Sequence, residues 1–302
     1  MHGDNILDIK RNLPDLEITP IQGEFLKLLP YRPTRTREKG LEEIVYTDKW
    51  GKVVIYGRET MNAFDLKVFV AFSYLLWKKI QAGDIYDAGE TIHELKEQGN
   101  TRREVTKLVG ITTTMSSFLK CMRITHSKSN ADLVWESLLR YVDTTWVFYL
   151  KRKDGGMDKI LSKIIHDIRQ SGNGLSVIVS ERYKNTIKRM SGVLGVTNRI
   201  IQSIKNDTAV LLSCWLQGKQ PVGTFYLVTI AEAVRIPKDR KTTERIKKAF
   251  DELKRQGQVD KYEIIREGKR SDNWKVYYEQ NKKLLSIIKS EMYAAKKALK
   301  KN

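Results

Sequence analysis

The residues that could perform covalent chemistry are few and scattered in this sequence. The four histidines form no HxH, HxxxH or HExxH pair that would hold a catalytic metal, and no GxxxxGK(S/T) loop is present to cradle a nucleotide. His166 and Arg169 match the His-x-x-Arg step that stabilises a scissile phosphate in tyrosine recombinases, but a single match is common by chance. The sequence therefore predicts no catalytic residue, no metal site and no cofactor.

Positive charge is the property that points most clearly to a partner. The 302 residues hold 55 Lys and Arg against 36 Asp and Glu, a net charge of +19. Residues 1–150 hold 21 basic and 20 acidic side chains, whereas residues 151–302 hold 34 and 16. An excess confined to one half is typical of an electrostatic footprint for a polyanion such as nucleic acid. A lysine-rich solvated surface, or an acidic membrane face or partner, would also account for it.

Cysteine content and hydropathy narrow the class of protein further. Cys121 and Cys214 lie far apart and share no metal-binding spacing, so neither a disulfide scaffold nor a zinc ribbon is predicted. The first residues lack the basic and apolar regions of a secretory signal. The longest apolar stretch, Val68 to Trp77, is about half a membrane span. We therefore expect a cytoplasmic protein that does not enter the membrane.

Residues 200–281 contain, in order, the elements of a winged helix. Asn206 and Asp207 can cap a helix over 208–217, and a β-like run at 225–228 precedes a short helix at 229–234. A turn, a longer helix and two strands joined by a basic loop follow at 235–240, 242–256, 259–265 and 274–278. The longer helix of such a unit enters the DNA major groove, and the loop between the strands contacts phosphates or the minor groove.

The polar face of helix 242–256 and the neighbouring basic loop supply the candidate DNA contacts of this unit. Apolar residues at helical spacing bury one face, so Thr242 and Arg245 are expected on the other. Arg245 could read guanine, and Thr242 a phosphate or a base edge. The full set of candidates is Lys238, Arg240, Lys241, Thr242, Arg245, Lys248, Arg266, Lys269, Arg270 and Lys275.

The first half repeats this order of elements with additional segments. A hairpin is predicted at 44–56, and a long core helix begins after Asn62 and ends at Gly83. A short helix at 115–122 and a longer one that Ser127 or Ser129 caps form a helix-turn-helix. Strands are predicted at 144–150 and 175–179, and further helices at 91–98, 101–109 and near 157–170. The face of this unit is only weakly basic. Its candidates for DNA contact are Lys128, Asn130, Arg140, Lys151, Arg152 and Lys153.

These patterns predict an α+β chain, predominantly α-helical, with two tandem winged-helix (helix-turn-helix) domains. Residues 1–40 are expected to be an irregular extension. An N-terminal winged helix for dimerisation or DNA contact is predicted over 41–199, and a C-terminal DNA-binding one over 200–281. Residues 282–302 are predicted as a basic helix with seven lysines and one glutamate.

The sequence resembles plasmid replication initiator proteins of the theta type, over roughly residues 45–280. The run from Val54 to Arg58, followed by Met61 and Asp65–Val68, looks like their opening Gly-Arg step and apolar helix. Residues 113–149 are similar to their first helix-turn-helix and residues 208–280 to their second winged helix. The turn at 129–132 departs from the family pattern, so the base-reading residues of the first unit do not carry over from the family.

The resemblance implies a function in DNA replication. Such initiators bind direct repeats at a plasmid origin as monomers, mainly through the C-terminal winged helix. They help to open an adjacent AT-rich duplex and bring in the host replication initiator and the replicative helicase. As dimers joined through the N-terminal winged helix, many repress their own promoter. The basic second half agrees with this division of labour.

Two other functions remain open on the sequence alone. A tandem winged-helix transcription regulator without a replication role would read DNA in the same way. Direct repeats near 20 bp in AT-rich DNA beside the gene would favour the initiator, and a lone inverted repeat the regulator. The helix at 282–302 could alternatively bind an acidic membrane surface.

Overall fold

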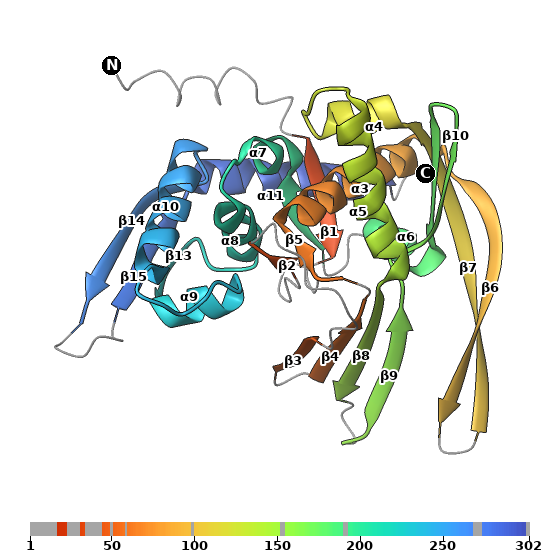
Figure 1. Cartoon of the computed structure of the whole chain (residues 1–302), viewed down its shortest axis with the longest axis horizontal. Coiled ribbons are helices and arrows are strands. Elements are labelled where there is room, and N and C mark those ends of the chain that lie inside the picture. The colour runs from red at the N-terminus through yellow and green to blue at the C-terminus, as the bar shows by residue number, and fades with distance from the viewer. Residues whose placement is uncertain are drawn as a thin grey trace. The chain divides into compact units, whose positions relative to one another are not determined.

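The protein is described by a computed structural model that covers residues 17–22, 31–33, 44–48, 51–57, 59–97, 100–151, 155–189, 193–267 and 274–299 (Figure 1). The chain divides into two compact units. Unit 1 comprises Met1–Arg37, Met61–Tyr74 and Gly192–Asn302, and unit 2 comprises Glu38–Thr60 and Leu75–Ser191. Helix α3 (Ala63–Ala82) runs through the boundary between these segments. These units cross the domain boundaries expected at residues 40 and 199.

The C-terminal part of unit 1 carries the elements predicted for residues 200–281. They are α8 (Asp207–Gln217), β13 (Val222–Tyr226), α9 (Leu227–Ala233), α10 (Thr242–Arg255), β14 (Val259–Arg266) and β15 (Trp274–Gln280). The strands form an antiparallel sheet in the order β13-β15-β14. Asn206 caps α8 as predicted, because its side-chain oxygen accepts the N–H of Ala209 at 3.0 Å.

An aromatic cluster holds α8 and α10 against one face of this sheet. The ring of Phe225 lies 4.9 Å from Trp215 and 5.9 Å from Tyr278, measured between centroids. Phe250, which is fully buried, stacks on Tyr262 at 5.1 Å. These rings come from α8, α10 and all three strands, so burying them fixes the helices relative to the sheet.

The remainder of unit 1 joins the N-terminal segments to the C-terminal half. Strand β1 (Ile18–Gln22) pairs with β12 (Val193–Thr197), and β2 (Tyr31–Arg32) pairs in parallel with β5 (Met61–Asn62). Helices α7 (Asn198–Ser203) and α11 (Lys282–Leu299) complete it. Ile21 and Tyr31 are buried. The expectation that residues 1–40 form an irregular extension is therefore wrong for both strands, because long-range pairing that no local pattern reports holds them in the unit.

Within its described residues, unit 2 contains two four-stranded antiparallel sheets, three complete helices and the end of α3. One sheet has the order β3-β4-β8-β9, formed by Ile44–Asp48, Gly51–Tyr56, Thr145–Lys151 and Met157–Ser162. The other has the order β10-β11-β7-β6, formed by Ile165–Ser171, Gly174–Ser180, Asn100–Thr114 and Tyr86–Glu97. The complete helices are α4 (Met115–Cys121), α5 (Lys128–Asp143) and α6 (Glu181–Arg189). The predicted hairpin at 44–56 and the strands near 144–150 and 175–179 are confirmed.

Helix ends in the first half follow the residues that predicted them. The side-chain oxygen of Asn62 accepts the N–H groups of Phe64 and Asp65 at the start of α3, and Gly83 follows the helix with a φ of 69° that glycine tolerates. Ser127 rather than Ser129 caps α5, because its hydroxyl accepts the N–H of Asn130 at 3.2 Å. The short helix, the turn and the longer helix predicted here are thus present as α4 and α5.

Three helices predicted in the first half are strands. Residues 91–97 lie in β6 and residues 101–109 in β7, whereas residue 98 lies outside the described residues. Strand β7 is hydrogen-bonded on both sides, to β6 and β11. The segment near 157–170 forms β9 and β10. A register shift between Ile165 and Asp167 leaves Ile165 and Ile168 both buried although they are three residues apart. This bulge imitates helical spacing, which explains the wrong prediction.

Candidate nucleic-acid interface

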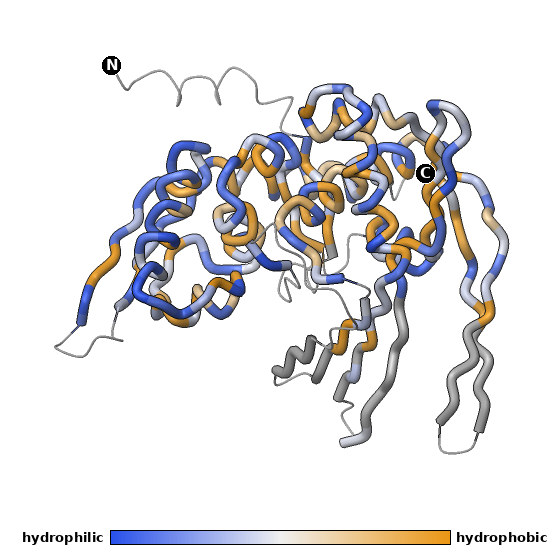
Figure 2. The backbone as a smooth tube through the Cα atoms, viewed as in Figure 1, coloured by the Kyte–Doolittle hydropathy of each residue, from blue (hydrophilic) through white to orange (hydrophobic). Residues whose placement is uncertain are grey.

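Helix α10 separates a buried apolar face from a charged exposed one. Ile246, Ala249, Phe250 and Leu253 are buried, as the periodicity predicted. Hydrophilic residues predominate along the helix and are interrupted at intervals by these hydrophobic ones (Figure 2). The charged face is therefore available to a partner at no cost to the core.

Thr242 is not on the charged face. Its side chain is buried, with an exposed fraction of 7%. The hydroxyl accepts the N–H of Asp239 at 2.8 Å and lies 2.9 Å from the carbonyl oxygen of Pro237 and 2.6 Å from that of Asp239, to which it donates. The expectation that Thr242 lies on the exposed face is wrong, because its side chain is buried and its hydroxyl is hydrogen-bonded to the preceding turn. Its role is to hold that turn at the start of α10.

Replacing Thr242 by valine should destabilise the protein by about 1 kcal/mol, because the N–H of Asp239 loses its acceptor and the buried hydroxyl its bonds to the turn. The half-exposed Thr243 on the next position provides a matched control. Thr243→Val should change the free energy of unfolding by less than about 0.5 kcal/mol. Urea denaturation of both variants measures the difference, and equal effects would contradict the role assigned to Thr242.

Arg245 is held by Asp239 in an ion pair at the start of α10. Its Nη1 lies 3.0 Å from both carboxylate oxygens. The backbone N–H of Lys241 donates to the same carboxylate at 2.8 Å. The Lys241 N–H and the Arg245 guanidinium together lower the pKa of Asp239 below its ordinary value. The pair fixes the guanidinium of Arg245, which is partly exposed, beside the first turn of the helix.

Two further candidates on this face also have acidic partners. Lys248 pairs with Glu244 at 2.6 Å along α10, and Lys238 pairs with Glu232. Exposed pairs of this kind contribute little to stability, so a phosphate can replace the acid at small cost. Arg240 and Lys241 are exposed, and neither side chain forms an ion pair within the described segments. Among the predicted cations around α10, these two therefore need to give up no acidic partner within the described segments before they contact a phosphate.

Lys247 was missed as a candidate on this helix. It is exposed on α10, without an ion pair within the described part of the chain. Helical periodicity places it opposite the buried Ile246, Phe250 and Leu253, so the spacing alone would have identified it.

The β14–β15 hairpin adds cations that lie over aromatic rings. Lys275 pairs with Glu267 at 2.6 Å and its amine lies 5.1 Å from the ring of Tyr226; the bond to Glu267 raises the pKa of Lys275. The guanidinium of Arg266 lies 5.8 Å from the ring of Trp274. Lys269 and Arg270 lie outside the described residues. Such cation–π contacts orient the cations without neutralising them.

The candidates of unit 2 do not form one surface. Lys128 is exposed at the start of α5, whereas the side-chain amide of Asn130 donates to the carbonyl of Thr125 at 2.7 Å. Arg140 is buried, with 5% of its side chain exposed, and its Nη1 lies 3.6 Å from Glu59. The expectation that Arg140 is exposed is therefore wrong, and DNA contact by Arg140 stays a prediction. Arg152 and Lys153 lie outside the described residues, and of Lys151 only the backbone is described.

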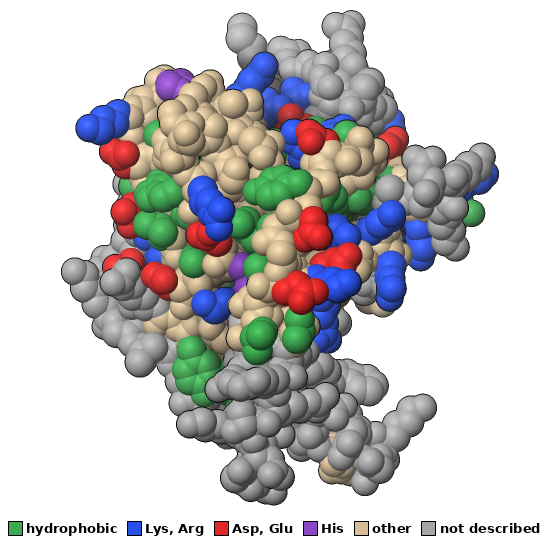
Figure 3. Space-filling model, turned by 90° about the vertical axis from the view of Figure 1, so that its right-hand side faces the viewer, with side chains coloured by type: hydrophobic (Ala, Val, Ile, Leu, Met, Phe, Trp, Pro, Cys, Tyr) green, Lys and Arg blue, Asp and Glu red, His purple; other side chains and the backbone are tan. Residues whose placement is uncertain are grey.

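The face of unit 2 that carries β6, β7 and β10 bears side chains of both charges (Figure 3). Positive and negative side chains are interspersed over it, with hydrophobic side chains between them. Exposed apolar residues of this unit include Ile92 and Val105, which are opposite each other on β6 and β7. Mixed charge of this kind gives no continuous attraction for a polyanion.

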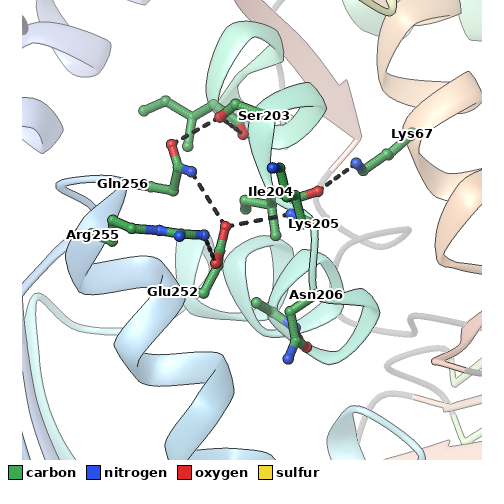
Figure 4. Close-up of polar contacts among 10 residues, drawn as sticks. Lys67, Ser203, Ile204, Lys205, Asn206, Glu252, Arg255 and Gln256 are labelled. Carbon is green, nitrogen blue, oxygen red and sulfur yellow. Dashed lines mark hydrogen bonds and ion pairs between the residues drawn. The ribbon is translucent and has the colours of Figure 1, made fainter. Parts of the chain in front are cut away.

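A polar network at the far end of α10 connects it to the turn between α7 and α8 (Figure 4). Glu252, which is buried, accepts the N–H of Lys205 and the side-chain amide of Gln256, each at 3.3 Å, and pairs with Arg255. Gln256 in turn accepts the hydroxyl of Ser203 at 2.8 Å. Sequence reasoning missed these residues, because a Glu among the lysines of an amphipathic helix looks like a solvated charge.

Lys67 of α3 supports the same turn from the other side. Its amine donates to the carbonyl oxygens of Ile204 at 2.5 Å and Gln202 at 3.3 Å. Burial lowers the pKa of Lys67, while the nearby Asp207 and Glu252 oppose this effect. The orientation of α10 is therefore fixed at both ends, by Thr242 at its start and by Glu252 near its end.

The described residues show no constellation for metal chemistry. No group of three or more His, Cys, Asp or Glu within them could hold a metal ion. Both cysteines are buried, and burial raises the pKa of Cys214 to about 12, so its thiol stays protonated. No helix among the described segments is both long and apolar enough to span a bilayer.

Comparison with known proteins finds solved structures with a similar fold. No protein-family model and no curated protein matches the sequence. Two crystal structures of domains 2 and 3 of RctB match it, with TM-scores of 0.56 and 0.54 and 10% identity. They cover 86% and 85% of this chain and 99% and 96% of their own. The chain has the fold of RctB domains 2 and 3.

The likeness to RctB extends over most of both units and confirms the predicted α+β class. A structure of the Pi initiator protein in complex with iteron DNA matches with a TM-score of 0.41 and 13% identity, over 78% of this chain and 98% of that one.

Proposed function

We propose that this protein binds duplex DNA sequence-specifically through α10 and the β14–β15 hairpin, and that it initiates replication from repeated origin sites. The observation that carries the proposal is the exposed basic face of α10, rigidly fixed beside a hairpin with oriented cations. The order of elements from α8 to β15 matches that expected of a winged helix, in which α10 would be the recognition helix. The fold shared with RctB, a replication initiator, supports the replication role.

Binding would proceed by exchange of ionic partners. The first turns of a recognition helix reach the base edges, and Arg245 lies there with its guanidinium on Asp239. A guanine N7/O6 edge offers two acceptors in place of the two carboxylate oxygens that Nη1 of Arg245 now contacts, so Arg245 can change partner by turning its guanidinium. Arg240, Lys241 and Lys247 then contact the phosphates and fix the register.

The proposal includes a second DNA-contacting or dimerising unit. The α4–α5 helix-turn-helix of unit 2, followed by its strands, would be the first winged helix of a tandem pair. As dimers through this unit the protein would repress its own promoter, and as monomers on direct repeats it would recruit the host replication initiator and replicative helicase. It would act in the cytoplasm, on its plasmid, and open the duplex by binding and bending rather than by catalysis.

The test is salt-titrated binding to the DNA that flanks the protein's own gene, against a scrambled duplex of equal composition. A preference of about 10³ or more at physiological salt is expected of a sequence-specific binder. Footprints spaced as direct repeats support the initiator, whereas a lone inverted repeat would identify a transcription regulator instead. Equal binding of both duplexes would overturn the proposal.

Arg245→Ala should cost about 1–3 kcal/mol of binding to the specific site and relax base preference at one position. Asp239→Asn is the comparison variant, because it removes the carboxylate that pairs with Arg245 but does not change Arg245 itself. It should preserve the base preference that Arg245→Ala loses. Binding to a panel of single-base variants measures both, and wild-type behaviour of Arg245→Ala would show that α10 does not read bases.

A further inference from the structure

Helix α11 is docked by its apolar face onto the β1–β12 pair. Leu284 and Ile288 are buried with 3% and 4% exposed. The helix lies so close to β12 that a methyl group on Gly195 would come within 2.5 Å of Ile288 and 3.1 Å of Met292. At its start, Asn281 caps the helix and donates its own N–H to the carbonyl of Gln258, just after α10. The helix is thus a fixed part of unit 1.

The opposite face of α11 is a row of lysines around one tyrosine. Lys282, Lys283, Lys289 and Lys297 are exposed. Tyr293, with 72% exposed, lies one helical turn from Lys289 and from Lys297 and is the most exposed large aromatic or apolar side chain in the described chain. We call this surface the α11 lysine face.

These lysines differ from the cations of α10 in having no acidic partners. None of the lysines of α11 forms an ion pair within the residues that the structure describes, whereas Arg245, Lys248 and Arg255 of α10 each do. Lys282 interacts electrostatically with Asp260, but the two side chains form no ion pair. Uncompensated positive charge on an ordered surface attracts a polyanion from solution.

Helix stability does not account for the position of these charges. Lys282 and Lys283 occupy the first turn, which holds no acidic residue, and the helix macrodipole disfavours cations there. A membrane surface does not account for them either. A helix that lies in a bilayer interface inserts its apolar face, and here Leu284 and Ile288 are already buried in the protein.

We propose that the α11 lysine face binds the phosphates of duplex DNA beyond the site read by α10. This inference rests on the proposed function, because it extends the same footprint. Helix α11 has 18 residues and is therefore about 27 Å long, and Lys282 and Lys289 lie about 10 Å apart along it. It can follow several phosphates of one strand without touching a base. The hydroxyl of Tyr293 supplies a hydrogen bond to phosphate between the lysines.

The experiment measures the salt dependence of binding by the full chain carrying Lys283→Gln, Lys289→Gln and Lys297→Gln. The slope of log K against log salt should fall in magnitude by about 0.9 for each phosphate that the variant no longer neutralises, up to about 2.7. Specific and scrambled duplexes should lose affinity equally, because phosphates carry no sequence information. Arginine at the same three positions should restore the slope. Thermal unfolding of each variant should match that of the wild type.

The matched control removes the same charge from exposed basic residues of unit 2 outside α4 and α5, through Lys107→Gln, Arg182→Gln and Lys188→Gln. It should leave the slope nearly unchanged. If the α11 variant keeps the wild-type slope while the wild type still prefers its specific site, the inference is wrong and the proposed function stands. If the wild type shows no preference, the proposed function fails first. If the α11 variant instead loses only binding to anionic lipid vesicles, the face is a membrane contact and the inference is overturned.

Discussion

Phe250→Ala should cost about 3–5 kcal/mol of stability and abolish DNA binding at temperatures where unit 1 no longer folds. Phe250 is fully buried on α10, and its ring lies 5.1 Å from Tyr262 and 6.4 Å from Tyr278. Removing it leaves a cavity between the helix that carries the candidate DNA contacts and the sheet that supports it. Urea denaturation gives the free energy of unfolding, and binding is measured on the same samples.

Two comparisons separate packing from contact with DNA. Phe250→Leu refills most of the volume and should cost about 1 kcal/mol while preserving binding. Binding by Phe250→Ala under conditions where circular dichroism shows it folded should equal that of the wild type, because the ring faces the core. A folded Phe250→Ala that fails to bind would mean that α10 depends on this residue for more than its position.

The elements of unit 1 from α8 to β15 could be predicted from the sequence, because local signals agree there. Asn206 caps α8, and the apolar residues of α10 recur at helical spacing. Helix α5 was predicted for the same reason, with Ser127 or Ser129 as its cap, and Ser127 caps it. Where capping, periodicity and turn residues indicate the same element, no knowledge of the rest of the chain is needed.

The failures have a different physical origin. Strand β1 is held by β12, about 175 residues further along the chain, and no local pattern reports such pairing. The bulge in β10 moved two buried isoleucines to helical spacing. The exposure expected of Thr242 and Arg140 was wrong for different reasons. Thr242 precedes the buried Ile246 by four residues, so helical spacing itself places it on the apolar face of α10. The burial of Arg140 depends on its partners in the folded chain, which helical spacing does not reveal.

The buried pair of Arg140 and Glu59 gives the second large effect that we expect. Arg140→Ala removes a guanidinium that is 5% exposed and lies 3.6 Å from a carboxylate that is 25% exposed. Breaking a buried pair by removing one partner costs about 3–5 kcal/mol, and the partial exposure of Glu59 places this case near the lower end. Unit 2 should therefore lose stability without any direct change at the α10 surface.

A double variant tests this explanation against a role of Arg140 in DNA binding. Arg140→Met with Glu59→Gln removes both charges while keeping most of the buried volume, so it should recover much of the stability that Arg140→Ala loses. If Arg140 is structural, DNA affinity follows stability, and the double variant binds as the wild type does. If Arg140 contacts DNA, the double variant is stable and still binds weakly, with a shallower salt dependence. Denaturation and salt-titrated binding of the same two variants therefore distinguish a buried ion pair from a DNA contact.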